Sequence, residues 1–141
     1  MIIEVRSRKQ AKLFTHEKPW AAISICTYED WPNLNDENRV GLLRLSFKDT
    51  NWPDQEGAMT DGQADKIVDF VDEILGEIDA LLIHCEAGLS RSPATAAAIV
   101  ALWGDGDTDY YFTHYLPNTL VYNKILKAAM RREKFKKKFL I

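Results

Sequence analysis

HCEAGLSRSP, residues 84–93, is the most informative segment of this sequence. It follows a short apolar run at 80–83 and leads into an alanine-rich apolar segment that ends at Gly104. The apolar run predicts a buried strand, and the segment from Arg91 predicts a helix with Pro93 in its first turn. A strand, a short loop and a helix start bring several backbone N–H groups around one point, where the helix dipole also favours an anion. The segment therefore predicts an anion-binding loop.

Two side chains of this loop carry the chemistry that we expect. Cys85 ends the apolar run, and Arg91 follows six positions later at the helix start. The thiolate is the nucleophilic form of cysteine, and a helix amino terminus beside an arginine stabilises it. Arg91 is always charged, its planar fork suits bidentate phosphate binding, and Gly88 lets the loop close tightly. We predict Cys85 as the nucleophile of phosphoryl transfer and Arg91 as the phosphate clamp, with Ser92 assisting departure of the thiolate.

The rest of the chain alternates apolar runs of strand length with segments of helical spacing. Further strands are expected at 2–5, 20–27 and 40–47. Helices are expected at 7–15, after a capping box formed by Thr60 and Gln63, at 92–103, at 107–116 and at 118–130. This order predicts an α/β fold with a central, mostly parallel sheet of four to five strands flanked by helices. Such folds bind ligands at the carboxyl ends of their strands, where Cys85 lies.

Length and charge indicate a single domain with an uneven charge distribution. The 141 residues are 46% apolar and 28% charged, which fits one domain over 1–141. The net charge is −3, yet a basic tail begins at about residue 131. We expect this tail either to contact an acidic partner or surface, or to be the solvated end of a helix. The acidic remainder argues against nucleic-acid binding.

Several classes of protein are excluded on composition. No apolar run is long enough for a membrane span, and no secretory signal is evident at the amino terminus. Two cysteines cannot build a disulfide framework, so a cytoplasmic setting is expected. His16, His84 and His114 lack metal-ligand spacing. We therefore expect no metal and no cofactor.

The pattern of His84-Cys85 followed by Arg91-Ser92 resembles the active-site signature of the protein tyrosine phosphatase superfamily, particularly its compact dual-specificity branch. The order of segments between about 20 and 129 is also similar. The resemblance implies hydrolysis of phosphomonoesters through a cysteinyl-phosphate intermediate, without metal, and a role for His84 in tuning the nucleophile. It also implies which backbone groups hold the phosphate together with Arg91, namely those of Glu86, Ala87, Gly88, Leu89 and Ser90.

The general acid that the family supplies from an upstream loop has two candidates here. Asp49 comes directly after a predicted strand, as in dual-specificity members. Asp54 completes Trp52-Pro53-Asp54, the tripeptide of the longer tyrosine-specific branch. A residue at a strand end is better anchored than one in the middle of a loop. We favour Asp49 and keep Asp54 as the alternative.

Two further positions have a possible role from the resemblance beside a plain structural one. Cys26 ends a predicted strand, where some relatives place a cysteine that forms a reversible disulfide with the nucleophile; an inert strand cysteine explains it as well. Asn118 lies where relatives often have a buried polar residue that supports the phosphate loop; a helix cap explains it equally.

The loop composition also bears on the substrate. Lysines in the loop would suggest a highly phosphorylated inositide, whereas this loop carries Glu86 and no lysine. A phosphorylated protein, with phosphotyrosine or phosphoserine/threonine, or a small phosphomonoester is therefore expected. A rhodanese or arsenate-reductase type cysteine-loop enzyme and a non-catalytic phosphate-binding module remain as alternatives.

Overall fold

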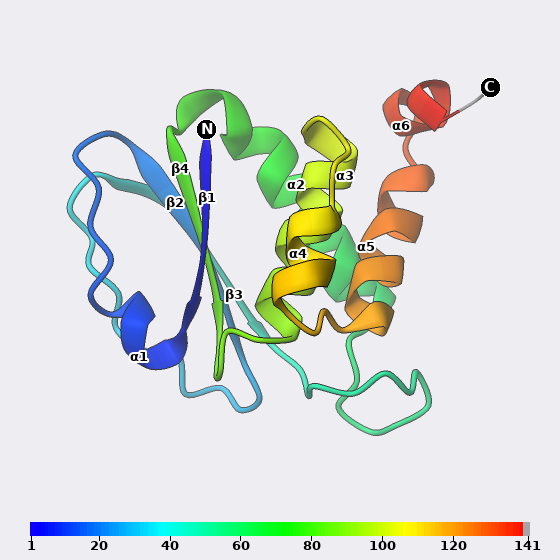
Figure 1. Ribbon diagram of the computed structural model, residues 1–141, viewed down its shortest axis with the longest axis horizontal. Helices are drawn as coiled ribbons and strands as arrows, with labels where there is room; N and C mark the ends of the chain where they lie inside the picture. Colours follow the sequence, from blue (N-terminus) through cyan, green and yellow to red (C-terminus); the bar gives the residue numbers. More distant parts are fainter. Residues whose placement is uncertain (140–141) are drawn as a thin grey trace.

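A sheet of four parallel strands forms the centre of the computed structural model, which describes residues 1–139. Its strands are β1 (Ile2–Ser7), β2 (Trp20–Cys26), β3 (Arg39–Ser46) and β4 (Ala80–Cys85). They lie in the order β1-β4-β2-β3 (Figure 1). The predicted α/β fold with a parallel sheet is confirmed. Because all neighbouring strands are parallel, their carboxyl ends lie at one edge of the sheet.

Helices cover the two faces of the sheet unequally. Within the described residues they are α1 (Arg8–Ala11), α2 (Asp61–Ile74) with the 3₁₀ turn η1 (Leu75–Glu77), α3 (Arg91–Trp103), α4 (Asp109–His114), α5 (Thr119–Met130) and α6 (Glu133–Phe139). In Figure 1, α2 to α5 lie on one side of the sheet and α1 lies on the other. No helix in residues 1–139 has the length and apolar character that a membrane crossing requires.

The apolar core is divided by the sheet. The larger cluster joins Ile23, Ile25 and Ile83 of the sheet to buried side chains of α2, α3 and α5. The smaller cluster lies under α1 and includes Phe14 and Trp20, whose rings meet edge to face with centroids 4.8 Å apart. Every residue of β2 is buried, as its apolar sequence predicts.

Two predicted helices begin or end differently in the structure. The helix expected over 7–15 ends after Ala11, since the chain turns there to bury Phe14 against Trp20. The helix expected from Asp107 begins at Asp109 instead. The Asp107 carboxylate accepts the backbone N–H of Asp109 in a turn that precedes the helix. The capping box of Thr60 and Gln63 is present as predicted at the start of α2.

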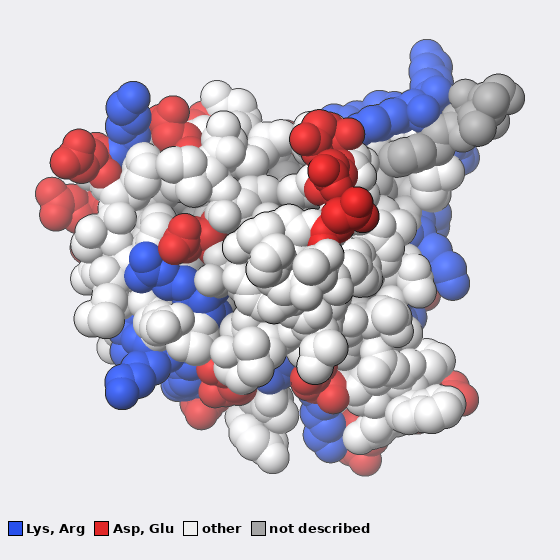
Figure 2. Space-filling view, viewed as in Figure 1, with Lys and Arg blue, Asp and Glu red and all other residues white. Residues whose placement is uncertain are grey.

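The basic segment from residue 131 is folded against the rest of the chain as far as the structure describes it. Phe135 of α6 is buried and meets Trp103 edge to face at 5.2 Å between ring centroids. Basic side chains pair with aspartates of α2, through Arg131–Asp65, Arg132–Asp69 and Lys134–Asp72. Figure 2 shows Lys and Arg side chains along the margin where α5 and α6 lie. The acidic surface that this segment contacts is therefore α2 of the same chain.

Replacing Phe135 with alanine should destabilise the protein by about 3–5 kcal/mol, the usual loss for a buried phenylalanine. The free energy of unfolding in urea measures the loss. Lys137→Ala, on the exposed side of the same helix, is the matched control and should change stability by less than about 0.5 kcal/mol. Equal effects of the two substitutions would show that α6 does not contribute to the core.

Candidate active site

The ends of three neighbouring strands meet at the loop formed by residues 86–90. This phosphate loop joins Cys85, the last residue of β4, to the amino terminus of α3. Thr27 follows β2 and Phe47 follows β3, and both contact Arg91 at the start of α3. The site therefore lies at the carboxyl edge of the sheet, where folds of this class bind ligands.

Gly88 sets the shape of the phosphate loop. Its φ of +72° is in the region that favours glycine, and a Cβ there would lie 2.6 Å from the backbone nitrogen of Ser7. The loop can therefore pack directly on the end of β1. The Gly88 N–H donates to Cys85 Sγ at 3.3 Å. The other loop N–H groups form no hydrogen bond with residues 1–139, which leaves them available to an anion: those of Glu86, Ala87, Leu89 and Ser90.

Cys85 lies at the base of this loop with a hydroxyl beside its sulfur. The residue is only 2% exposed, and its Sγ lies 3.1 Å from Ser92 Oγ. Ser92 is fully buried in the first turn of α3. The structure thus places the predicted nucleophile and the predicted assisting hydroxyl in direct contact.

Arg91 is held by one side of its guanidinium group. Its Nη1 donates to the Phe47 carbonyl at 2.7 Å and to Thr27 Oγ1 at 3.0 Å. Its Nε is buried and is the one buried side-chain N or O atom in residues 1–139 without a hydrogen-bond partner. Buried donors of a charged group are costly to leave unpaired. The free Nε edge is therefore where an oxyanion is expected to bind.

Asp49 reaches the phosphate loop, whereas Asp54 does not. The Asp49 carboxylate accepts hydrogen bonds from Ser90 Oγ and Asn118 Nδ2, both at 2.8 Å. Asp54 is exposed and forms no hydrogen bond or ion pair with the part of the chain that the structure describes. The geometry therefore favours Asp49 as the residue that can act at this loop.

Asn118 both caps a helix and contacts the phosphate loop. Its Oδ1 accepts the N–H of Val121 at 3.0 Å and so caps α5. Its Nδ2 donates to the Asp49 carboxylate and to the Thr50 carbonyl, and its backbone N–H donates to the Ser90 carbonyl. The same residue thus joins the start of α5, the phosphate loop and the loop of residues 47–60 that carries Asp49, which we call the acid loop.

His84 is buried beneath the nucleophile and makes two polar contacts. Its Nε2 lies 2.5 Å from Ser24 Oγ, and its Nδ1 lies 3.1 Å from the Cys85 carbonyl. Burial lowers the pKa of His84 below its ordinary value of 6.5. The neutral ring then donates from Nδ1 to the carbonyl and accepts at Nε2 from the serine hydroxyl. His84 thereby fixes the backbone at the nucleophile.

Protein stability should fall as the pH drops below about 6.5 because of His84. Its pKa is lower in the folded state than in the unfolded chain, so only the unfolded chain gains this proton just below pH 6.5. The free energy of unfolding should decline by up to about 1.4 kcal/mol per pH unit until the folded-state pKa is reached. Urea unfolding between pH 5 and 7.5 measures this slope. His84→Gln should remove it, whereas His114→Gln on the exposed end of α4 should not.

Cys26 lies near the loop but on a different side of the sheet. Ser24 and His84 are in register and in contact, and side chains alternate along a strand, so Cys26 points to the His84 side. Cys85 points to the opposite side, toward Ser92. Both thiols are free. Burial, with a smaller effect of the Glu86 charge, raises the pKa of Cys26 to about 11. A disulfide with Cys85 remains a prediction that needs the end of β2 to rearrange.

The Cys26 thiol is one of three potential metal ligands that lie close together. Ligand atoms of Cys26, Asp30 and Glu86 lie within 4.8 Å of one another. The guanidinium of Arg8 contacts all three, at 3.4 Å from Cys26 Sγ and 3.4 Å from Glu86 Oε1, and with an ion pair to Asp30. Arg8 therefore supplies the positive charge at this cluster.

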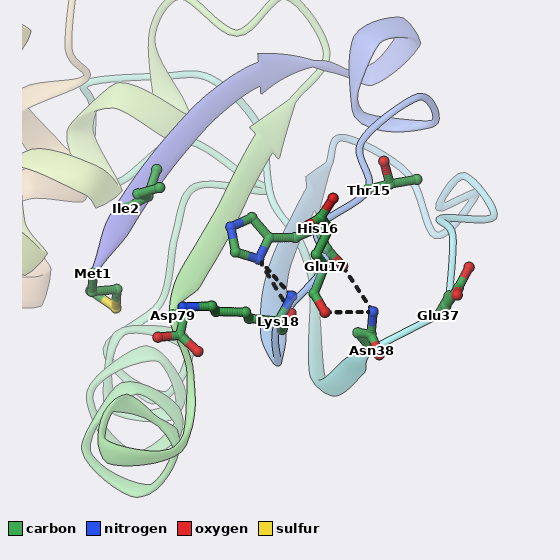
Figure 3. A pocket seen from close by; sticks show the side chains of 9 residues that line it. All are labelled: Met1, Ile2, Thr15, His16, Glu17, Lys18, Glu37, Asn38 and Asp79. Atoms are coloured by element: carbon green, nitrogen blue, oxygen red, sulfur yellow. Dashed lines mark hydrogen bonds between the residues drawn. The ribbon is translucent and has the colours of Figure 1, made fainter.

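A separate hollow of about 770 Å³ lies at the amino-terminal end of β1, near His16, Lys18 and Asp79 (Figure 3). Some of its polar groups bind one another: the Lys18 N–H donates to His16 Nδ1, and Asn38 Nδ2 donates to the carbonyls of His16 and Glu17.

Comparison with solved structures identifies the fold. The model superposes on PTPMT1 in complex with PI(5)P with a TM-score of 0.60, at 15% identity over 99% of this chain and 95% of the other. Human DUSP28 gives a TM-score of 0.60 at 14% identity over 92% of each chain. The chain has the fold of the dual-specificity phosphatases. Tk-PTP in its active form also shares this phosphatase fold, with a TM-score of 0.59 and 17% identity over 94% of this chain and 93% of the other. By sequence, no family model and no curated protein matches the chain.

Four residues that support the phosphate loop or its neighbouring residues were not singled out from the sequence. Thr27 and the Phe47 carbonyl hold Arg91, Ser24 holds His84, and Arg8 holds Glu86. Each of these contacts joins segments far apart in the chain. For Thr27 and Phe47, one feature of the sequence could have indicated a place near the site: each lies at the end of an apolar run. The carboxyl ends of parallel strands lie at the same edge of a sheet.

Proposed function

We propose that this protein is a metal-independent, cysteine-dependent phosphatase that hydrolyses phosphomonoesters through a cysteinyl-phosphate intermediate. The observation that carries the proposal is the buried Arg91 Nε without a partner, beside loop N–H groups that also lack one. A dianionic phosphate would satisfy all of these donors at once. Cys85 lies at the base of the same loop, where its sulfur can attack the bound phosphorus.

The reaction follows from the groups around the loop. In the first step the Cys85 thiolate forms a bond to phosphorus while the ester oxygen leaves with a proton from Asp49. Arg91 and the loop N–H groups stabilise the charge on the phosphoryl oxygens. In the second step water attacks phosphorus, the Asp49 carboxylate takes its proton, and inorganic phosphate is released. Ser92 Oγ, 3.1 Å from the sulfur, stabilises the departing thiolate by hydrogen bonding.

The loop favours a phosphorylated protein over a highly phosphorylated lipid headgroup. Each additional phosphate needs additional cations, but the loop itself contributes Arg91 and the acidic Glu86. The PTPMT1 structure nevertheless holds PI(5)P in the same fold. A lipid substrate therefore belongs among the compounds to be tested.

Steady-state hydrolysis in the presence of EDTA tests the proposal. Substrates are an aryl phosphate, a phosphotyrosine peptide, a phosphothreonine peptide and PI(5)P. We expect turnover of the aryl phosphate and of at least one peptide, and acid quenching should trap phosphate on Cys85. Absence of phosphate release from every substrate would contradict the proposal. Turnover of thiosulfate or arsenate in that case would identify a sulfurtransferase or reductase, and phosphopeptide binding alone would identify a binding module.

A further inference from the structure

Glu86 poses an electrostatic problem for a loop that binds phosphate. It directly follows Cys85, and its side chain is 41% exposed and lies beside Cys26 and Asp30. A negative charge at this place repels a dianionic substrate unless a cation compensates it. A compensating cation should therefore be sought beside Glu86.

Arg8 is that cation. Its Nη1 lies 3.4 Å from Glu86 Oε1 and 3.5 Å from Asp30 Oδ1, and its Nη2 donates to the Asp30 carbonyl. Its backbone N–H donates to the Glu86 carbonyl at 3.0 Å. Arg8 thus holds both the side chain and the main chain of the first residue in the phosphate loop.

The position of Arg8 is fixed by the fold. It follows β1, which is in register with β4 up to the pair Ser7–Cys85. Gly88 allows the loop to approach Ser7, as described above. The Arg8 side chain is 25% exposed, so its charge is only partly screened by water. The planar guanidinium group has several N–H donors and can bind two carboxylates at once, whereas the lysine ammonium group is a compact point charge.

We propose that Arg8 is a positioning residue that neutralises Glu86 and thereby sets the affinity of the phosphate loop for dianionic phosphate. Arg8 acts through Glu86 and does not touch the substrate. The inference rests on the proposed phosphatase function, but the oxyanion affinity that it concerns can be measured without turnover.

A double-mutant cycle separates charge compensation from simple structural support. The probe is tungstate, a phosphate-like dianion, and its Kd is measured by calorimetry at low salt. We expect Arg8→Gln to weaken binding roughly fivefold to tenfold, and 0.5 M salt to reduce this difference. Arg8→Gln combined with Glu86→Gln should restore most of the affinity, since the carboxylate next to the loop is then removed. Asp30 loses its partner in both variants, but its side chain is 64% exposed and its charge is therefore better screened by water.

Arg6→Gln is the matched control, because Arg6 lies two positions before Arg8, on β1, and pairs with Glu4 instead of the loop. It should leave the tungstate Kd unchanged. If the double variant binds as weakly as Arg8→Gln, or if Arg8→Gln binds normally, the inference is wrong. If wild type binds tungstate but hydrolyses no phosphate ester, the proposed function fails while the cycle still decides the role of Arg8.

Discussion

Replacing Cys85 with serine should abolish phosphate release, with a loss of roughly 10⁴-fold or more in kcat. A serine hydroxyl keeps its proton at neutral pH and is a poor leaving group from phosphorus, so both steps fail. The substitution is nearly isosteric at a residue that is 2% exposed, and the Ser92 contact can be kept. Hydrolysis of an aryl phosphate between pH 5 and 8, in the presence of EDTA, measures the loss.

Tungstate binding provides the control for this substitution. Cys85→Ser should bind the anion with an affinity similar to that of wild type, since Arg91 and the loop N–H groups remain. Retained binding with lost turnover assigns a chemical role to the sulfur. Residual turnover within tenfold of wild type would show that another group is the nucleophile.

Replacing Asp49 with asparagine should lower kcat for an aryl phosphate about 10²–10⁴-fold, the usual contribution of a general acid. The amide cannot deliver a proton to the ester oxygen, while its size preserves the contact with Ser90. The loss should be smaller for substrates whose leaving oxygen is weakly basic, because those need less protonation. The variant should also lose the basic limb of the pH–rate profile.

Asp54→Asn is the matched control for Asp49→Asn. Asp54 lies five positions further along the same loop, is exposed and forms no hydrogen bond or ion pair with residues 1–139. We expect its kcat and pH profile to follow wild type. If Asp54→Asn loses the basic limb and Asp49→Asn keeps it, the assignment is reversed, and the acid loop must close over the site in a way that the structure does not show.

The local pattern around residues 84–93 was sufficient to predict the anion loop, and the order of apolar runs and helical segments along the chain was sufficient to predict the fold class. A buried apolar run, a loop with glycine and a helix start each depend on neighbouring residues, so they can be recognised without tertiary information. The helix ends were less predictable. The helix expected over 7–15 stops at Ala11 because burying Phe14 against Trp20 outweighs the helical tendency of that segment.

The choice between Asp49 and Asp54 shows what local pattern could not decide. Their surroundings in sequence are similarly polar, and the tripeptide ending in Asp54 favours the alternative acid. The deciding contacts join Asp49 to Ser90 and to Asn118, 41 and 69 positions away along the chain. Only the packing of α5 against the acid loop brings these groups together.

The ion pairs of the basic segment from residue 131 also could not be predicted from the sequence. The composition of this segment leaves open whether it pairs with acidic groups or is solvated. The aspartates of α2 follow one another at helical spacing, and α6 packs beside them through Phe135. The sequence alone was sufficient to predict Cys85 as the nucleophile and Arg91 as the phosphate clamp, because that prediction depends on residues that are close together in the chain. The contacts of Asp49, the support of Arg91 and the partner of Glu86 were decided by the tertiary structure, because each joins segments that are far apart in the chain.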